Sequence, residues 1–87
     1  MNSNMDDFNR GCACILGALY REFPVPVDLR MDALAGDHIV QTIYGHTVTF
    51  LADAGLLSFV AKTEDNAGFT GVRLTAMGLN KLNEPAE

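Results

Sequence analysis

The chain has 87 residues, of which 48% are hydrophobic and 20% charged, and its formal net charge is −5. This composition is typical of one small globular domain, so we expect a single domain over residues 1–87 with an ordered core at about 5–82. The acidic balance argues against strong nucleic-acid binding by one subunit, because Lys and Arg supply that affinity. No apolar run is long enough for a membrane helix, and the start lacks a signal-peptide pattern, which predicts a cytoplasmic protein without a membrane partner.

The first helix is predicted over residues 4–23. Its apolar residues recur at spacings of three and four and form one stripe: Phe8, Cys12, Ile15, Leu16, Leu19 and Phe23. Gly11 and Gly17 weaken a helix by about 1 kcal/mol each relative to Ala. We therefore expect them to permit the close approach of another helix, either within the domain or across a dimer interface.

The segment 23–29 holds two prolines, which end the first helix because each removes an amide donor and favours extended geometry before it. Val25 and Val27 are candidates for a very short edge strand. The next residues, 28–35, are predicted to form a short helix with Asp28 as its N-cap.

A longer helical stretch follows, with Asp37 as its predicted N-cap. Residues 38–54 either form one continuous helix or a helix–turn–helix broken near Gly45. The continuous helix is favoured, because a lone glycine costs less than a helix stop requires. Gly55 falls where a left-handed C-terminal cap is expected, with Leu56 as the apolar contact after it.

A β-hairpin is predicted after this helix. Residues 57–62 alternate between apolar and polar side chains, as in a half-buried strand. The second strand is expected at residues 69–74, after a polar turn at 63–68. Gly71 is a candidate bulge within that second strand.

The chain ends in a short predicted helix with Thr75 as its N-cap and with Leu79 and Leu82 packed inward. The predicted elements therefore form an α+β domain that is mostly α. No internal repeat, low-complexity tract or long linker divides it.

Two phrases resemble those of the winged-helix regulators of bacteria, such as the MarR and PadR types. The first lies within Phe50–Leu57, where leucine, three residues, glycine and leucine end a helix and open a hairpin. The second is Leu-Thr-Ala-Met-Gly, at residues 74–78. The resemblance covers about Phe8 to Leu82. It implies a helical N-terminal part, a recognition helix, a two-stranded hairpin called the wing and a short C-terminal helix. Winged helices read DNA, and they also serve as protein-interaction modules.

The resemblance places the recognition helix near 44–54 and the tip of the wing at 63–68. The candidates for a recognition surface are Gln41, Tyr44, His46, Thr47, Thr49 and Asp53. The candidates on the wing are Lys62, Glu64, Asp65, Asn66 and Arg73. One departure weakens DNA reading: no Lys or Arg occurs between Met31 and Ala61. Base edges and phosphates are usually contacted by such cations, and the carboxylates of this wing would repel phosphates.

These residues predict a non-enzymatic interaction module that acts in regulation through a protein partner or as a homodimer. The first alternative is a dimeric DNA-binding transcription regulator, with His46, Thr47 and Thr49 at the bases and with Lys62 and Arg73 at the phosphates. The second alternative is a small acidic inhibitor that occupies the nucleic-acid-binding surface of another protein, its carboxylates standing in for phosphates.

The sequence has no recognisable catalytic triad and no phosphate-binding glycine loop. Cys12 and Cys14 are one residue apart inside a predicted helix, a spacing that fits neither a disulfide nor a zinc site with His38 and His46. They read as small, buried, free cysteines of a reducing compartment. We therefore expect no catalytic residue, metal, cofactor or small-molecule substrate.

Overall fold

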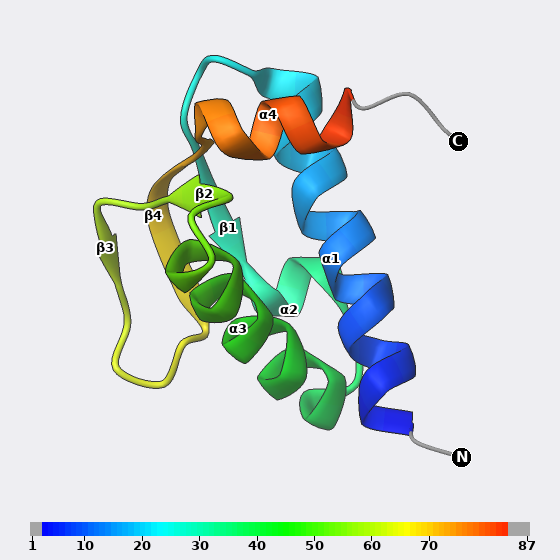
Figure 1. Ribbon diagram of the computed structural model, residues 1–87. Coiled ribbons are helices and arrows are strands. Elements are labelled where there is room, and N and C mark those ends of the chain that lie inside the picture. The colour runs from blue at the N-terminus through cyan, green and yellow to red at the C-terminus, as the bar shows by residue number, and fades with distance from the viewer. Residues whose placement is uncertain (1–2, 84–87) are drawn as a thin grey trace.

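The computed structural model describes residues 3–83 as an α+β arrangement of four helices and a small antiparallel sheet (Figure 1). The elements in chain order are α1 (Ser3–Glu22), β1 (Val27–Arg30), α2 (Met31–Leu34), α3 (His38–Asp53), β2 (Leu57–Ser58), β3 (Ala61–Lys62), β4 (Gly68–Leu74) and α4 (Ala76–Leu82). No helix that residues 3–83 form is both long and apolar enough to cross a membrane.

Strand β4 is the centre of the sheet. It pairs with β1 on one side and with β2 and β3 on the other, always antiparallel. Leu57 lies opposite Leu74, and Ala61 lies opposite Thr70, so β2 and β3 keep one common register on β4. The predicted strand 57–62 is therefore present in two short pieces, interrupted at Phe59 and Val60.

The predicted bulge lies at Gly71, which has a φ of +64°. The register between β1 and β4 shifts between Val27 and Leu29, and the carboxylate of Asp28 accepts a hydrogen bond of 3.1 Å from the amide of Gly71. The prediction that Asp28 caps a helix over 28–35 is wrong. Residues up to Arg30 are held extended by β4, so the helix begins only at Met31. The short edge strand is present, a few residues later than Val25.

Helix α3 runs without a break through Gly45, so the alternative of a broken helix–turn–helix is wrong. The predicted N-cap is confirmed, because the carboxylate of Asp37 accepts hydrogen bonds from the amides of the first turn. The predicted C-cap is also confirmed. Gly55 has a φ of +84°, and the amide of Leu56 donates to the carbonyl of Leu51 over 3.0 Å, as in a Schellman motif.

The core lies between α1, α3 and the sheet. Its buried residues are Ile15, Leu19, Leu29, Met31, Tyr44, Val48, Leu51, Leu57, Phe69, Val72 and Leu74. A Cβ at Gly11 would lie 2.9 Å from the ring of Tyr44, so this glycine permits α3 to approach α1 within the domain. Gly17 has no such neighbour, because only the side chain of Arg21, on the same helix, comes within 4 Å.

Helix α4 packs across one end of α1 (Figure 1). Its predicted cap is confirmed, because the hydroxyl of Thr75 accepts a 3.0 Å hydrogen bond from the amide of Gly78. Leu79 packs against the core as predicted. The same prediction for Leu82 is wrong: its side chain is 40% exposed. The hydroxyl of Tyr20 donates to Asn83 over 3.0 Å, which joins the ends of α1 and α4.

Candidate interaction surface

Helix α3 turns two of the predicted recognition residues into the core. Tyr44 is 6% exposed and packs on Gly11, and Thr47 is 1% exposed. The hydroxyl of Thr47 donates to the carbonyl of Ile43 over 2.7 Å, so it is also occupied within the helix. Both recognition-surface candidates are therefore buried side chains, although Thr47 also lines the groove described below. They share the buried face of α3 with Val48, one turn away.

The other four candidates differ in how freely they face solvent. His46 and Asp53 are exposed on α3. Thr49 is half-buried, and its hydroxyl donates to the carbonyl of His46 over 2.8 Å. The side-chain amide of Gln41 donates to the carbonyl of Ala35 over 2.8 Å and so holds the segment before α3. Of the predicted recognition set, His46 and Asp53 are thus the side chains most available for a partner.

The loop at the predicted wing tip, residues 63–67, is organised by its own side chains. The carboxylate of Asp65 accepts hydrogen bonds from the hydroxyl of Thr63 at 2.7 Å and from the amide of Ala67 at 3.1 Å. The hydrogen bond from Thr63, and then that from Ala67, lower the pKa of Asp65 below its ordinary value. Asn66 takes a left-handed conformation with a φ of +59°. The loop is therefore a defined turn.

This loop packs on α3. A Cβ at Gly45 would overlap the backbone oxygen of Asn66, so Gly45 leaves the room in which the loop lies. A hollow of about 230 Å³ between loop and helix is lined in part by His38, Gln41 and Asp65. The side-chain oxygen of Asn66 is buried without a hydrogen-bond partner among residues 3–83. Glu64 is exposed, and its carboxylate forms no hydrogen bond with residues 3–83.

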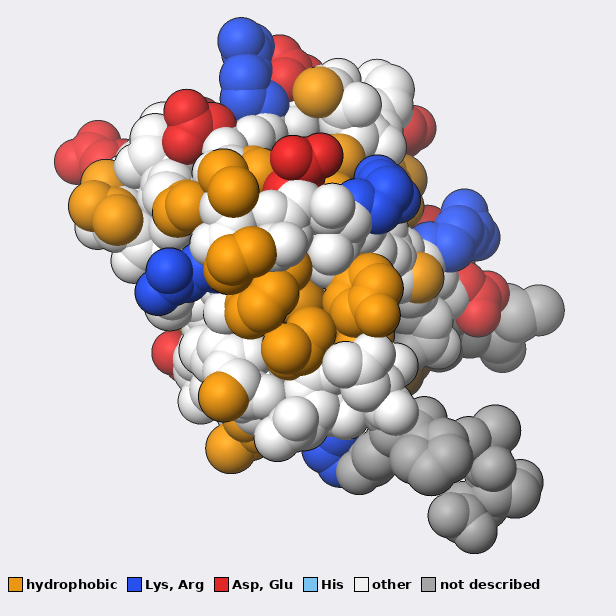
Figure 2. Space-filling model, turned by 90° about the horizontal axis from the view of Figure 1, so that it is seen from above, with side chains coloured by type: hydrophobic (Ala, Val, Ile, Leu, Met, Phe, Trp, Pro, Cys, Tyr) orange, Lys and Arg blue, Asp and Glu red, His pale blue; other side chains and the backbone are white. Residues whose placement is uncertain are grey.

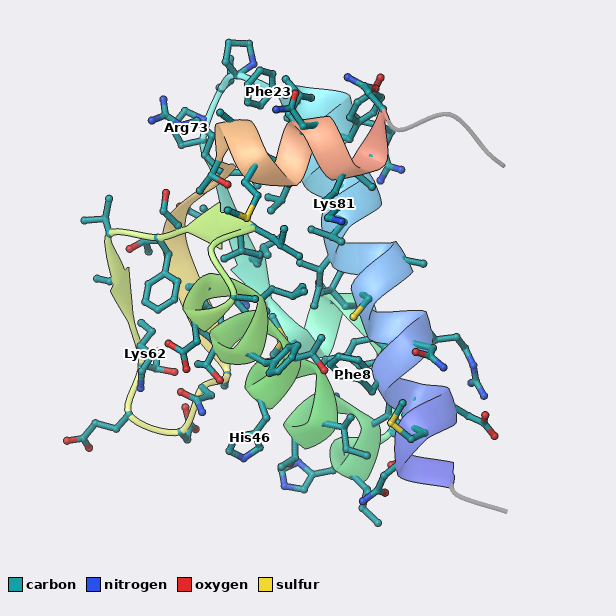
Figure 3. All side chains as sticks on the ribbon, in the orientation of Figure 1. Phe8, Phe23, His46, Lys62, Arg73 and Lys81 are labelled. Atoms are coloured by element: carbon teal, nitrogen blue, oxygen red, sulfur yellow. The ribbon has the colours of Figure 1, made fainter. Side chains whose placement is uncertain are left out.

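The structure does not bring the predicted base-reading and phosphate-binding residues together in one chain. Figure 3 shows His46 at one end of the molecule and Arg73 at the opposite end, beside Phe23. Lys62 lies on the hairpin side, where its ammonium group donates to the neighbouring carbonyl of Thr63 over 3.4 Å.

Sequence reasoning named His46 and Thr47 but missed the groove that they line in part, between the first turns of α1 and the outer face of α3. It measures about 400 Å³ and is lined by Asn4, Met5, Phe8, Ile43, His46, Thr47 and Phe50. We call it the α1–α3 groove. The rings of Phe8 and Phe50 meet edge to face with centroids 5.4 Å apart. Met5 is 49% and Phe50 55% exposed, large values for such apolar side chains.

A signal for this groove exists in the sequence. Ile39, Ile43 and Phe50 recur at helical spacing beside the buried stripe that contains Tyr44 and Leu51, so α3 is apolar on two faces. The core of this domain buries only one of these two apolar faces. On the second face, Ile39 and Phe50 stay 69% and 55% exposed.

Cys12 and Cys14 are free and half-buried, and burial raises the pKa of the Cys12 thiol. Within residues 3–83 no group of three or more His, Cys, Asp or Glu side chains is placed to hold a metal ion.

Comparison of the chain with protein-family models, with curated proteins and with solved structures finds no match.

Proposed function

We propose that this protein is a winged-helix interaction module without enzymatic activity, which acts in regulation by contacting a protein chain at the α1–α3 groove. The order of the elements supports the winged-helix assignment: a helix, a short strand, two helices, a hairpin and a last helix. The strand order β1-β4-β2 supports it too, because the short strand β1 pairs with β4, the second strand of the hairpin, as in a winged-helix domain.

The observation that carries the proposal is the exposure of large apolar side chains on the outer face of α3. Phe50 and Ile39 are 55% and 69% exposed there, on the face where a DNA-reading helix would carry cations. Apolar groups of this size in a shallow groove are typical of protein-binding sites, where aromatic anchors contribute most of the binding free energy. Phosphate groups, by contrast, offer no apolar surface to such side chains.

The charges also favour a protein partner over DNA. The face of α3 offers His46 and Asp53 but no Lys or Arg, and Glu64 is exposed on the hairpin loop beside it. Because Arg73 lies at the other end of the molecule, one subunit presents no row of cations to a phosphate backbone (Figure 3).

A DNA titration tests the proposal. Fluorescently labelled duplexes of mixed sequence, and duplexes from the region beside the gene, are titrated with the protein at about 20 mM salt, where phosphate attraction is strongest. We expect no binding below about 100 μM, the weak end of non-specific affinity. Micromolar binding that weakens with salt, and that is lost in Lys62→Glu but kept in Phe50→Asp, would contradict the proposal and favour a DNA-binding regulator.

A further inference from the structure

The hollow between the β3–β4 loop and α3 is a second candidate binding site, beside the α1–α3 groove. We call it the loop–α3 hollow. It measures about 230 Å³ and is lined by Met31, His38, Gln41, Thr42, Asp65, Asn66 and Ala67. The close approach of Asn66 to Gly45 sets the loop against the helix and so fixes the two walls of the hollow.

The side-chain oxygen of Asn66 is the feature that points to a ligand. It is buried and has no hydrogen-bond partner among residues 3–83. An unpaired buried acceptor costs free energy, and nearly all such groups in folded proteins accept from a protein donor or a bound molecule. The amide of asparagine turns about a torsion with broad preferences, so this oxygen can turn to a donor that enters the hollow. A ligand with N–H groups would therefore satisfy it.

Three other lining side chains also present oxygen atoms as acceptors. The side-chain nitrogen of Gln41 already donates to the carbonyl of Ala35, which leaves its Oε1 without a partner in the described chain. The hydroxyl of Thr42 donates to the carbonyl of His38 over 3.1 Å, so its lone pairs remain. Both hydrogen bonds that Asp65 accepts from its loop end on Oδ1, and Oδ2 is left to accept from elsewhere. The hollow thus suits a molecule with several donors.

A carboxylate makes the hollow attractive to cations. Among its described lining residues, Asp65 is the one acid and His38 the one base. The neighbouring charges are satisfied elsewhere: Asp37 accepts from the first amides of α3, and Arg30 pairs with Asp32 at 2.8 Å. Figure 2 looks down on the end of the molecule formed by α4 and shows Lys and Arg side chains at the margin of that other face.

The same groups disfavour an anion. Asp65 would repel it, and Asp37 already occupies the amides with which the start of a helix binds anions. Lys62 lies on the hairpin, but its ammonium group donates to the carbonyl of Thr63 and forms no ion pair with Asp65. The ligand that fits is therefore a cation with N–H donors.

A guanidinium group has the chemistry that this hollow requires. It carries five N–H donors in one plane, and it is more weakly hydrated than an ammonium group, so it enters a half-enclosed hollow at a smaller cost. A divalent metal ion fits less well, since within residues 3–83 no group of three or more His, Cys, Asp or Glu side chains is placed to hold one. Arginine is also among the residues that contribute most to protein interfaces.

The hollow and the groove lie on neighbouring sides of α3. Thr42 lines the hollow and His46 lines the groove, and residues four apart on a helix are neighbours, with about 6 Å between their Cβ atoms. We propose that the loop–α3 hollow binds the guanidinium group of an arginine carried by the protein that docks in the α1–α3 groove. This inference rests on the proposed function and adds the chemistry of the partner, which is an apolar segment with an arginine beside it.

Amide chemical shifts of the isotope-labelled full chain test the binding chemistry without the partner. The probe is Nα-acetyl-arginine methylamide. We expect saturable shift changes at residues 38–45 and 63–68, with a dissociation constant of about 1–10 mM. The citrulline analogue lacks the charge, and the lysine analogue lacks the planar array of donors, so both should bind more weakly, the first by about tenfold or more. No saturable change at about 50 mM probe, or equal affinity for the citrulline analogue, overturns the proposal.

Two variants remove acceptors, and a third is their matched control. Asp65→Asn removes the carboxylate, and Asn66→Gly removes the amide while glycine keeps the positive φ of this position. Each should weaken binding of the arginine analogue about tenfold, as loss of a hydrogen bond to a charged group does. Glu64→Gln removes a neighbouring carboxylate that does not line the hollow, so binding should be unchanged. Equal weakening by Glu64→Gln and Asp65→Asn would mean general attraction by the acidic surface and would refute the site. Circular dichroism melts show that each variant is folded.

A second arm asks whether the guanidinium group belongs to the partner. A photoreactive amino acid at position 50 captures the protein in the groove, and adduct yields are compared with and without Asn66→Gly or Glu64→Gln. We expect Asn66→Gly to lower the yield about threefold or more and Glu64→Gln to leave it unchanged. If the analogue binds but Asn66→Gly leaves the yield unchanged, the hollow takes a free guanidinium compound and the proposal is wrong. No adduct at all removes the proposed function as well, whereas a normal adduct without binding of the analogue removes this inference alone.

Discussion

The backbone oxygen of Asn66 lies against Gly45, in the middle of α3, where any side chain would overlap it. This approach joins the β3–β4 loop to the helix and brings Asp65 and Asn66 beside the first turns of α3. The loop can lie this close to the helix only because Gly45 has no Cβ. Substitution of Gly45 by alanine therefore tests the position of the loop.

Gly45→Ala should destabilise the protein. The added methyl group displaces the loop or the helix, and overpacking of this kind costs about 1–3 kcal/mol even where alanine favours the helix. Gly17→Ala is the matched control in α1, because a Cβ there would meet only the far end of Arg21, at 3.8 Å. That variant should gain up to about 1 kcal/mol from helix propensity. Urea unfolding followed by circular dichroism measures both, and equal stability of the two variants would refute the close approach.

Thr75→Ala should loosen the attachment of α4. The hydroxyl of Thr75 accepts from the amide of Gly78 at 3.0 Å and donates to the carbonyl of Gly55 at 2.5 Å, so it caps α4 and joins it to the end of α3. Loss of an N-cap costs about 0.5–2 kcal/mol. Thr75→Ser keeps both hydrogen bonds and is the control. Free energies of unfolding from urea titrations decide the matter: if the Ala and Ser variants unfold at the same urea concentration, the hydroxyl has no such role.

Asp65→Asn should lower stability at neutral pH and lose this effect in acid. Hydrogen bonds from Thr63 and Ala67 lower the pKa of Asp65 in the folded state, so its carboxylate stabilises the loop above the unfolded pKa, near 4. That contribution disappears as the pH falls through the lowered, folded-state pKa. Urea midpoints compared at pH 7 and at about pH 2.5 should therefore show a gap between wild type and variant that closes in acid. Glu64→Gln, in which the replaced carboxylate has no hydrogen bond within residues 3–83, should leave the midpoint unchanged at both. A difference in urea midpoint between wild type and Asp65→Asn that widens in acid would contradict the lowered pKa of Asp65.

The thiol of Cys12 should alkylate more slowly in the folded protein than in urea. Burial raises its pKa, and the thiolate is the reactive form, so the pH–rate profile in the folded state should be shifted to higher pH. The Cys14→Ser variant isolates this thiol, and mass spectrometry after iodoacetamide treatment gives the rates. Identical profiles for folded and unfolded protein would contradict the shift.

Local sequence signals account for much of the fold. Asp37, Gly55 and Thr75 were predictable as caps, because each acts on backbone groups within a few residues of itself. Asp28 was misassigned because its partner, the amide of Gly71, lies 43 residues away, and its residue type alone is equally typical of a helix N-cap. Pairing with β4 overrides the local preference and delays the helix to Met31.

The candidate surface was predictable only in part. Helical periodicity groups Phe50 with Leu51, yet Leu51 is buried and Phe50 is exposed, since their side chains point about 100° apart. Which of two apolar stripes faces the core depends on where α1 packs, and that follows from Gly11 receiving Tyr44 rather than from any pattern within α3. No pattern in the sequence shows that the loop at residues 63–67 packs on Gly45.

Site-specific photo-crosslinking from position 50 tests the central claim most directly. A photoreactive amino acid replaces Phe50 in the protein expressed in its own cells, and the same substitution at Val60 is the control. We predict that light produces an adduct at position 50 which resists nuclease, contains a second polypeptide and is absent at position 60. An adduct at position 50 that nuclease removes, or no adduct there at all, would contradict the claim that the α1–α3 groove contacts protein.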